Sequence, residues 1–592
     1  MSELPAAVAE AVDQRFAAFA ALAAGGGRPP APGVAWGVMI GGRLVHDGGL
    51  GTLRDGDDRR PGPDSAFRIA SMTKSVTSAA VLLLRDDGAL RLDDLVARHV
   101  PDLDDLVDLA DLMGESAPIT VRALLSMAAG LPQDDAWADR LEDLAEDAFT
   151  ELVRGPKTFA WATGTAYEYS NLGYAILGRV VANVAGAPFV EVVRERLLQP
   201  LGLTSTTFSD DELRPEQVAS GHHRVDDRWE VQAVQRPGAF SPIGGLYSSV
   251  RDIAVWMAGF CDAWPRGDED GVPHPLSRTT RREMQRIETA MSPRLHRDHA
   301  GRLRVVASGY CLGLVSEEDV VSGRALGHSG GYPGFGSHMR WHPATGIGVV
   351  AFANGRYAPA WEPATEALEL LVAADAALRR RTRPSPAIEA ARRDVEQLFE
   401  RWDDGIVARF SPNVALDEPL DRRRAAIAHL RETYGRLRSD GDVLVETPVR
   451  VRWWLAGERG GRVEVAISLT PEVPPRIQVL ELTAVPEPPV RLRELAVMLV
   501  AAINAGGDLP PNVIAPAAEP DATAVASTLR EAAVLLAPCR LSDAVRGDGR
   551  TTATFLVESR AGPFDLTVAS AGNGGGLTGV VLDPRQRVTT PD

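Results

Sequence analysis

Residues 67–74 read Phe-Arg-Ile-Ala-Ser-Met-Thr-Lys and place Ser71 three positions before Lys74. Segment 66–70 predicts a short extended stretch, and 71–87 predicts a helix with a strongly apolar middle. Residues three apart on a helix lie on one face, with Cβ atoms about 5–6 Å apart. The sequence therefore predicts a serine hydroxyl and a lysine amine side by side at the start of a helix.

These two residue types together can perform nucleophilic chemistry. A serine hydroxyl is a weak nucleophile until an adjacent base accepts its proton. The helix dipole and the apolar stretch 79–84 both disfavour a charged ammonium, so Lys74 can be partly neutral and act as that base. Only Lys74 and Lys157 among the 63 basic residues are lysines, and arginine does not release its proton in proteins. On this motif alone, a surface lysine near a helix start remains the alternative interpretation.

A second motif, Tyr-Ser-Asn at 169–171, precedes an expected helix at 171–184. The phenol of Tyr169 can serve as a second proton relay if a cation lowers its pKa. The amide of Asn171 can hold both a lysine and a substrate carbonyl, because it carries an acceptor and two donors. The alternative interpretation is a helix cap at Asn171 with Tyr169 as a packing residue.

A third motif, His-Ser-Gly at 328–330, opens a strand-like stretch and is followed by Gly331. Small residues here would let a substrate lie against the strand edge, with N–H groups aimed at an oxyanion. A glycine-rich turn is the alternative interpretation.

The segment 327–331 also fits Gly-x-Ser-x-Gly, the pattern of a nucleophile elbow around Ser329. An elbow requires a helix after the serine, and Tyr-Pro-Gly-Phe-Gly at 332–336 does not start one.

The order of expected elements indicates an α/β sandwich with an inserted helical subdomain. Segments 34–40 and 43–46 flank two glycines and predict a hairpin. Residues 89–240 look mainly helical, and strand-like segments return after residue 326, so both ends of the region supply one sheet. The expected helices of the block are 92–99, 121–127, 141–153, 171–184 and 189–198; the later strands are 327–342 and 346–353, followed by a helix at 361–378.

Beyond a basic, proline-punctuated linker at 381–386 the chain repeats itself. Pro-Asn-Val at 412–414 recurs at 511–513, and Leu-Arg-Glu at 430–432 recurs at 529–531. In each copy a helix precedes the first motif, a second helix follows it, and three strand-like stretches come next. In the first copy these stretches lie near 442–456, 462–469 and 476–484. We expect two small α+β modules at 387–486 and 487–592, with a loose resemblance to NTF2-like domains.

The charge and the cysteine and histidine content of the chain argue against nucleic acid, membranes and metal ions as partners. The net charge of −17 would be repelled by a nucleic-acid backbone or an anionic membrane, so neither is expected. The three cysteines form no pair that suggests a disulfide framework or a zinc site. His338 and His342 are four apart in an extended stretch, so no metal site is expected either. Residues 1–24 predict an amphipathic helix without the features of a signal peptide, which favours a cytoplasmic protein.

The three motifs in this order resemble the class C β-lactamase and penicillin-recognising serine hydrolase family, which also holds D-alanyl-D-alanine carboxypeptidases, D-aminopeptidases and esterases. The resemblance covers about 30–375. It implies a β-lactamase/transpeptidase-like α/β (α+β) domain at 1–380, with an antiparallel sheet, flanking helices and the helical subdomain at about 89–240. Further family-like stretches are ALRLDDLVARHVPDL (89–103), ITVRALLSMAAGLP (119–132), YEYSNLGYAILGRVV (167–181), GGLYSSVRDIAVW (244–256) and GHSGGYPGFG (327–336).

The resemblance also implies a role for each motif residue and no cofactor or metal. Histidine in the third motif is more like the carboxypeptidase and D-aminopeptidase branches than the true β-lactamases. ALLSMAAGL at 123–131 and Thr-Gly-Thr at 163–165 also depart from the common pattern. The implied roles are Ser71 as acylated nucleophile, Lys74 as its proton partner, Tyr169 as general base, Asn171, His328, Ser329 and Gly330 as substrate-binding residues, and the N–H groups of Ser71 and Gly331 as oxyanion hole.

The expected activity is hydrolysis of small esters, amides or peptides through an acyl-enzyme, of the esterase or D-peptide hydrolase type. β-Lactamase or D-alanyl-D-alanine carboxypeptidase activity is the alternative, and a catalytically inactive binding protein is the alternative from another class. A protonated His328 would bind substrate carboxylates and lose that affinity above about pH 6.5. The C-terminal modules could dimerise, giving a homo-oligomer, or shield the cleft.

Overall fold

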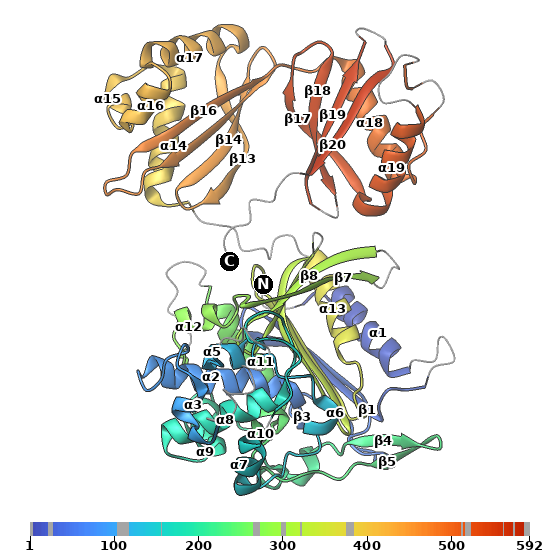
Figure 1. The fold of residues 1–592 in the computed structure, drawn as a ribbon. Helices are drawn as coiled ribbons and strands as arrows, with labels where there is room; N and C mark the ends of the chain where they lie inside the picture. Colours follow the sequence, from blue (N-terminus) through green and yellow to red (C-terminus); the bar gives the residue numbers. More distant parts are fainter. Residues whose placement is uncertain are drawn as a thin grey trace. The chain divides into compact units, whose positions relative to one another are not determined.

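The computed structural model describes residues 4–21, 28–103, 118–155, 157–264, 273–297, 303–319, 322–374, 384–510, 513–515, 522–559, 562–571 and 575–584. The chain divides into two compact units, Met1–Arg380 and Arg381–Asp592 (Figure 1). Each unit has its own hydrophobic core.

An eight-stranded antiparallel sheet forms the centre of the first unit. Its spatial order is β2-β1-β12-β11-β10-β9-β8-β7, so the first two strands of the chain pair with its later ones. The strands are β1 (Gly33–Ile40), β2 (Arg43–Gly51), β7 (Thr289–Arg297), β8 (Leu303–Tyr310), β9 (Val315–Asp319), β10 (Gly323–Tyr332), β11 (Phe335–His342) and β12 (Ile347–Ala353).

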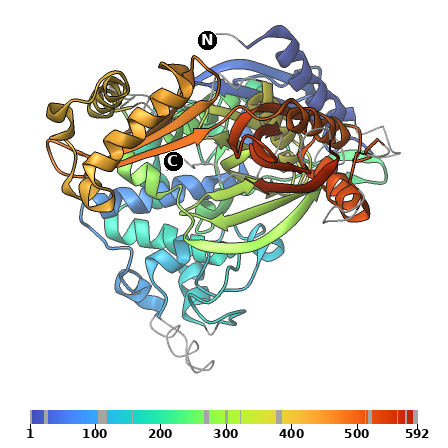
Figure 2. The same cartoon turned by 90° about the horizontal axis from the view of Figure 1, so that it is seen from above.

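Strand β1 shows why the sheet needs cover on both faces. Successive side chains of a strand point to opposite faces. Val34, Trp36 and Val38 pack on one face against α1 (Ala6–Ala21) and α13 (Trp361–Ala374), and the Trp36 ring stacks on Phe16 at 4.7 Å. Ala35 and Met39 point the other way, into the core shared with α2 (Thr73–Asp86) and α11 (Val250–Asp262). In Figure 2, dark-blue α1 and the cyan helices lie on opposite sides of the sheet.

The inserted helical subdomain packs around α2, whose side chains are buried without a break from Thr73 to Leu84. This burial on all sides explains why its apolar residues follow no one-sided pattern. α8 (Asn171–Ala185) packs directly against α2. The other helices of the subdomain are α3 (Val96–His99), α5 (Val121–Leu125), α6 (Asp135–Ala138), α7 (Glu146–Arg154) and α9 (Phe189–Val193). The short helices α10 (Ser241–Gly244) and α12 (Arg278–Glu283) follow it in the chain.

Several expected elements of this unit have different bounds. The expected helix at 92–99 begins only at Val96, because Asp94 caps a turn before it through the Arg91 N–H. The expected strand 327–342 is a hairpin of β10 and β11, because Gly334 has a φ of +96° and turns the chain. Strands β7, β8 and β9 were not predicted at all. Their mixed polar and apolar residues, such as Arg294 and Glu317, lack a strong strand pattern.

The second unit contains two modules, each with helices on a four-stranded antiparallel sheet. Four strands replace the expected three, because 442–456 is a hairpin rather than one strand. The first module has α14 (Pro386–Glu400), α15 (Asp404–Val407), α16 (Pro412–Asp417), α17 (Leu420–Tyr434), β13 (Leu437–Thr447), β14 (Arg450–Gly457), β15 (Arg462–Leu469) and β16 (Ile477–Val485). The second has α18 (Val490–Asn504), α19 (Ala522–Leu536), β17 (Cys539–Gly547), β18 (Thr552–Ser559), β19 (Phe564–Ser570) and β20 (Leu577–Pro584).

The repeated sequence motifs occupy matching places only in part. Leu430-Arg431-Glu432 and its later copy both lie in the helix that precedes the sheet, α17 and α19. Pro412 opens α16, whereas Pro511 and Asn512 of the second copy lie outside the described residues.

Among the described helices, none by itself combines the length and apolar character needed to cross a bilayer. α8 and the adjoining α9 with its π-helical turn, η5 (Arg194–Leu198), pass that test only as a pair bent by 79°.

Candidate active site

Ser71 lies in a single 3-10 turn, η2 (Ala70–Met72), directly before α2. Ala70 holds a left-handed φ of +48°, a strained conformation for a residue with a side chain. The turn packs against β10, where a Cβ at position 330 would lie 2.2 Å from the Ile69 carbonyl oxygen. The Ser337 hydroxyl also donates to that carbonyl at 2.6 Å. Gly330 is therefore needed so that the strand can approach the nucleophile turn.

Lys74 is completely buried, and its amine faces three oxygen atoms. The distances from Nζ are 3.0 Å to Ser71 Oγ, 2.6 Å to Asn171 Oδ1 and 2.8 Å to the Ile243 carbonyl oxygen. Burial lowers the pKa of Lys74 to about 8, although nearby aspartates oppose the shift. A group with that pKa is neutral in roughly one molecule in ten near pH 7. The amine is thus placed and tuned to accept the Ser71 proton.

Tyr169 lies on the other side of the serine. Its hydroxyl lies near the Ser71 side chain, which acts to lower the pKa of the phenol, and its ring centroid is 5.0 Å from Lys74 Nζ. Burial raises the pKa of Tyr169 well above 10, with negative charge from Asp135 and Asp139 adding to the shift. The condition set from the sequence, a cation that lowers the pKa of the phenol, is therefore not met. The phenol is protonated and is suited to relay a proton rather than to begin as a phenolate base.

Asn171 is fixed in orientation by two carboxylates. Its Nδ2 donates to Asp134 at 3.1 Å and to Asp135 at 2.8 Å, which turns Oδ1 toward Lys74. Asp134 also accepts the N–H groups of Asn171 and Leu172 at the start of α8. Sequence reasoning found Asn171 but missed both aspartates. Their signal was the acidic pair at 134–135, which lies one residue after the family-like stretch 119–132.

His328 on β10 is neutral. Its Nδ1 is 2.6 Å from the Ser329 carbonyl oxygen, which can only accept, so Nδ1 carries the proton. Nε2 then accepts from the Tyr310 hydroxyl at 3.1 Å. Burial, together with the charge of Lys74, lowers the pKa of His328 to about 4. The hypothesis of an imidazolium that binds carboxylates around pH 6.5 is therefore wrong.

The end of β10 presents an open backbone edge beside the serine. β9 pairs with β10 only from Gly323 to Gly327, so within the described residues the edge from His328 onward has no strand partner on that side. Beside this edge lies a cleft of about 500 Å³. Its walls include Ser71, Tyr169, Tyr310, His328, Ser329 and Gly331. The three sequence motifs are thus brought together around one cavity, whereas Gly330 packs behind it.

A comparison with known proteins now decides the family. The family model described as Beta-lactamase matches residues 12–374, more than half of the chain. The chain belongs to the β-lactamase family. Its fold is correspondingly the β-lactamase/transpeptidase-like one, and the sequence-based identification of the family is confirmed.

Individual relatives match over parts of their length. The chain is 32% identical over 200 residues to Beta-lactamase-like protein 2 of Dictyostelium discoideum, covering 33% of this chain and 35% of that protein. It is 26% identical over 234 residues to Protein flp of Staphylococcus aureus strain MW2, covering 38% and 45%. A similar solved structure is the octameric penicillin-binding protein homologue from Pyrococcus abyssi, with a TM-score of 0.51 and 19% identity over 81% of this chain and all of that one.

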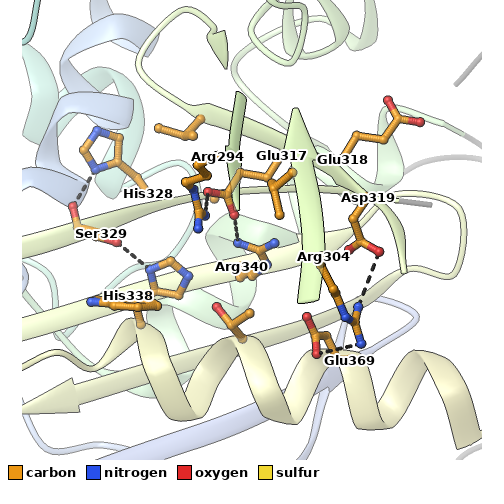
Figure 3. A pocket seen from close by; sticks show the side chains of 15 residues that line it. Arg294, Arg304, Glu317, Glu318, Asp319, His328, Ser329, His338, Arg340 and Glu369 are labelled. Atoms are coloured by element: carbon orange, nitrogen blue, oxygen red, sulfur yellow. Dashed lines mark hydrogen bonds and ion pairs between the residues drawn. The ribbon is translucent and has the colours of Figure 1, made fainter. Parts of the chain in front are cut away.

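Within this β-lactamase-family site, Ser329 is the rival nucleophile. Its exposed hydroxyl is 2.9 Å from His338 Nδ1, as Figure 3 shows. Burial lowers the pKa of His338 to about 3, so the ring is a weak base. Ser329 lies in the middle of a strand that ends in a hairpin turn, not at a strand-to-helix elbow. The arrangement therefore favours Ser71 over Ser329.

A buried ion pair supports the far end of β10. The guanidinium of Arg68 contacts Glu142, and both side chains are almost fully buried. Tyr332, the last residue of β10, donates its hydroxyl to the same Glu142 carboxylate at 2.6 Å. The pair links the strand before Ser71 to the strand that borders the cleft.

We expect Glu142→Gln to lower the free energy of unfolding by about 3 kcal/mol, because it leaves the Arg68 charge buried without compensation. Urea unfolding followed by tryptophan fluorescence measures the change. The double variant R68M/E142M is the control and should recover much of the loss, since apolar side chains need no partner. A single variant as stable as the wild type would contradict this account of the pair.

Proposed function

We propose that this protein is a serine hydrolase that forms an acyl-enzyme on Ser71. The observation that carries the proposal is the contact of a buried, low-pKa amine with a hydroxyl that borders an open cleft. Complete burial of a lysine ammonium costs folding free energy. Groups whose pKa is strongly shifted by burial concentrate at functional sites. Membership of a family of serine hydrolases supports the same conclusion.

The proposed reaction begins when neutral Lys74 accepts the Ser71 proton and Oγ attacks the substrate carbonyl carbon. The backbone N–H groups of Ser71 and Gly331 are proposed to bind the oxyanion. Protonated Tyr169, which lines the cleft beside Ser71, is proposed to deliver a proton to the leaving group and then recover one from the ammonium of Lys74. Water attacks the acyl-enzyme in the second half, with the same groups moving the proton in reverse.

For the substrate class, we propose small esters, amides or peptides, of the esterase or D-peptide hydrolase type. A neutral His328 stands where most β-lactamases carry a lysine, so the third motif supplies no positive charge for a carboxylate. This favours esters and peptides over the alternatives, a β-lactamase or a D-alanyl-D-alanine carboxypeptidase. An inactive binding protein is disfavoured by the intact contacts of the Ser71 hydroxyl.

Active-site mapping tests the proposal. The full-length protein is treated with a fluorophosphonate, digested and analysed by mass spectrometry. The label is expected on Ser71 and should be reduced by prior incubation with substrate. A panel of p-nitrophenyl esters, D-amino-acid nitroanilides and nitrocefin then ranks the substrate classes. A label on Ser329, or no label with any activated acyl donor, would overturn the assignment.

The pH dependence follows from the Lys74 pKa. The reaction requires the neutral amine, which is the minor form below about pH 8 and the major form above it. We therefore expect kcat/KM for a neutral ester to rise about tenfold for each pH unit below that pKa and to level off above it. The profile is measured from about pH 6 to pH 9.5 with the spontaneous rate subtracted. A flat profile would argue against Lys74 as the base.

Self-association of this chain is likewise a proposal. The octameric assembly belongs to the Pyrococcus abyssi homologue, whose fold this chain shares. Analytical ultracentrifugation of the full-length chain, and of a chain that ends before residue 381, tests whether the C-terminal modules contribute to assembly.

A further inference from the structure

The walls of the cleft carry one sign of charge. Asp135, Asp139 and Glu168 line it, and no lysine or arginine does so among the described residues. His328, the remaining titratable base on the wall, is neutral. The nearby Lys74 amine lies behind Ser71 and is positive in most molecules near pH 7, so it offsets one of these three carboxylate charges. A substrate in this cleft therefore meets a net negative field.

These carboxylates are held in place by neutral donors. Asp135 accepts from the amides of Asn171 and Gln133. Glu168 accepts from the indole N–H of Trp161 at 2.9 Å and from the Gln133 backbone N–H at 3.2 Å. Hydrogen bonds of this kind hold an ionised carboxylate without cancelling its charge. None of the ion pairs of the described residues compensates Asp135 or Glu168, so their charge stays directed at the cleft.

Asp139 is a buried residue of the cleft lining and accepts the Tyr357 hydroxyl at 2.9 Å. Tyr357 has a left-handed φ of +50°, which costs energy in a tyrosine and brings its ring to the cleft. Burial raises the pKa of Asp139 to about 6, so the group is still mostly ionised above neutral pH. Tyr167 and Tyr310 add two more aromatic rings to the wall. Aromatic faces attract cations. The Tyr357 ring already has the Arg356 guanidinium 5.6 Å from its centroid, so Tyr167 and Tyr310 are the rings that reinforce the effect of the carboxylates.

A neighbouring cavity of about 340 Å³ shares Val315, His328 and Ser329 with the cleft. It contains arginines, but Figure 3 shows each of them next to an acid. Arg294 and Arg340 both pair with Glu317. Arg304 pairs with Asp319 and Glu369. Glu318 also lines the cavity, so three arginines face four acids and a substrate carboxylate would meet no net positive charge there.

We infer that the proposed hydrolase selects acyl donors that carry a positive charge, such as a protonated amine or a quaternary ammonium, near the scissile bond. The carboxylates and tyrosine rings of the cleft would surround that charge while Ser71 attacks the carbonyl. This inference rests on the proposed function of Ser71 and specifies the substrate class of the same site. Anionic acyl donors would be repelled, which sets the cleft apart from a carboxylate-binding site.

Matched substrates test the inference on the full-length wild-type protein. Alanyl and isobutyryl p-nitroanilides have the same shape but differ by an amine on the acyl side. Acetylthiocholine and 3,3-dimethylbutyl thioacetate differ in the same way on the leaving side. We expect kcat/KM near pH 7 to favour the cationic member of at least one pair by at least about tenfold, and a succinyl analogue to be the poorest substrate. The preference should shrink as salt is raised, because screening weakens exposed charges.

Charge-removing variants locate the source of the preference. Glu168→Gln and Asp135→Asn should each reduce the cation-to-neutral ratio several-fold, whereas Glu191→Gln on the exposed side of α9 should not change it. Fluorophosphonate labelling of each variant shows that the site is still folded. Ratios near one for both substrate pairs, with Ser71 labelled and neutral esters hydrolysed, would overturn the inference and leave the proposed function standing. Absence of labelling in the wild type would instead remove the proposed function.

Discussion

Replacing Ser71 by alanine should abolish fluorophosphonate labelling and lower kcat/KM by at least about 10⁴-fold. The expected size follows from other serine hydrolases, where loss of the nucleophile removes nearly all rate acceleration that does not come from binding. Stability should change little, because the side chain is small and lies at the cleft surface. Steady-state kinetics on the best substrate of the panel measures the effect.

Ser329→Ala is the matched control, since both serines line the same cleft and both contact a nitrogen base. This variant should keep its label and retain activity within about tenfold, because Ser329 contributes at most a hydrogen bond to substrate. The reverse pattern, with labelling lost in Ser329→Ala and kept in Ser71→Ala, would move the reaction to the Ser329–His338 pair.

The family and the placement of the three motifs were accessible from the sequence because each motif is short and local. Ser71 and Lys74 are one helical turn apart, so helix geometry alone brought them together. The contact of Lys74 with Asn171 spans 97 positions, so no local geometry predicts it, and amide chemistry indicated only that Asn171 can hold a lysine. The structure places these side chains around one cleft, while their catalytic roles stay predictions.

The charge states of the site were less accessible, because they depend on burial. His328 had been expected to titrate near its reference pKa, yet its closed surroundings lower that pKa to about 4. A relay role for Tyr169 had been tied to a cation that lowers its pKa, and burial raises that pKa instead. Desolvation is set by atoms from many segments, among them Tyr310 on a strand that no sequence pattern predicted.

Loop residues of the cleft were missed for a related reason. Asp134, Asp135 and Asp139 lie in and around α6, a helix of only four residues with no clear periodicity. Acidic residues in such a segment look like ordinary surface charge. Their hydrogen bonds to Asn171 and Tyr357 exist only after α8 and the segment after β12 have folded against them.

The second large effect is expected for Lys74→Arg, which should lower kcat/KM by about 10³-fold or more. Arginine keeps the positive charge and can still donate to Ser71, but its guanidinium does not lose a proton at any accessible pH. General base catalysis by a positioned side chain is worth about 10²- to 10⁴-fold, and this contribution should be lost. The rise of activity toward pH 8 should disappear together with the base.

Lys157→Arg provides the control, because Lys157 is the other lysine of the chain and is not among the residues that line the cleft. Its amine donates to backbone carbonyls at the end of α7, including that of Leu152, and a guanidinium can replace it there. If Lys74→Arg retained wild-type activity and a rising pH profile, another group would have to accept the Ser71 proton. If instead Lys74→Arg is inactive while Ser71 is still slowly labelled by fluorophosphonate, the amine acts by taking up a proton and not merely by holding the serine in place.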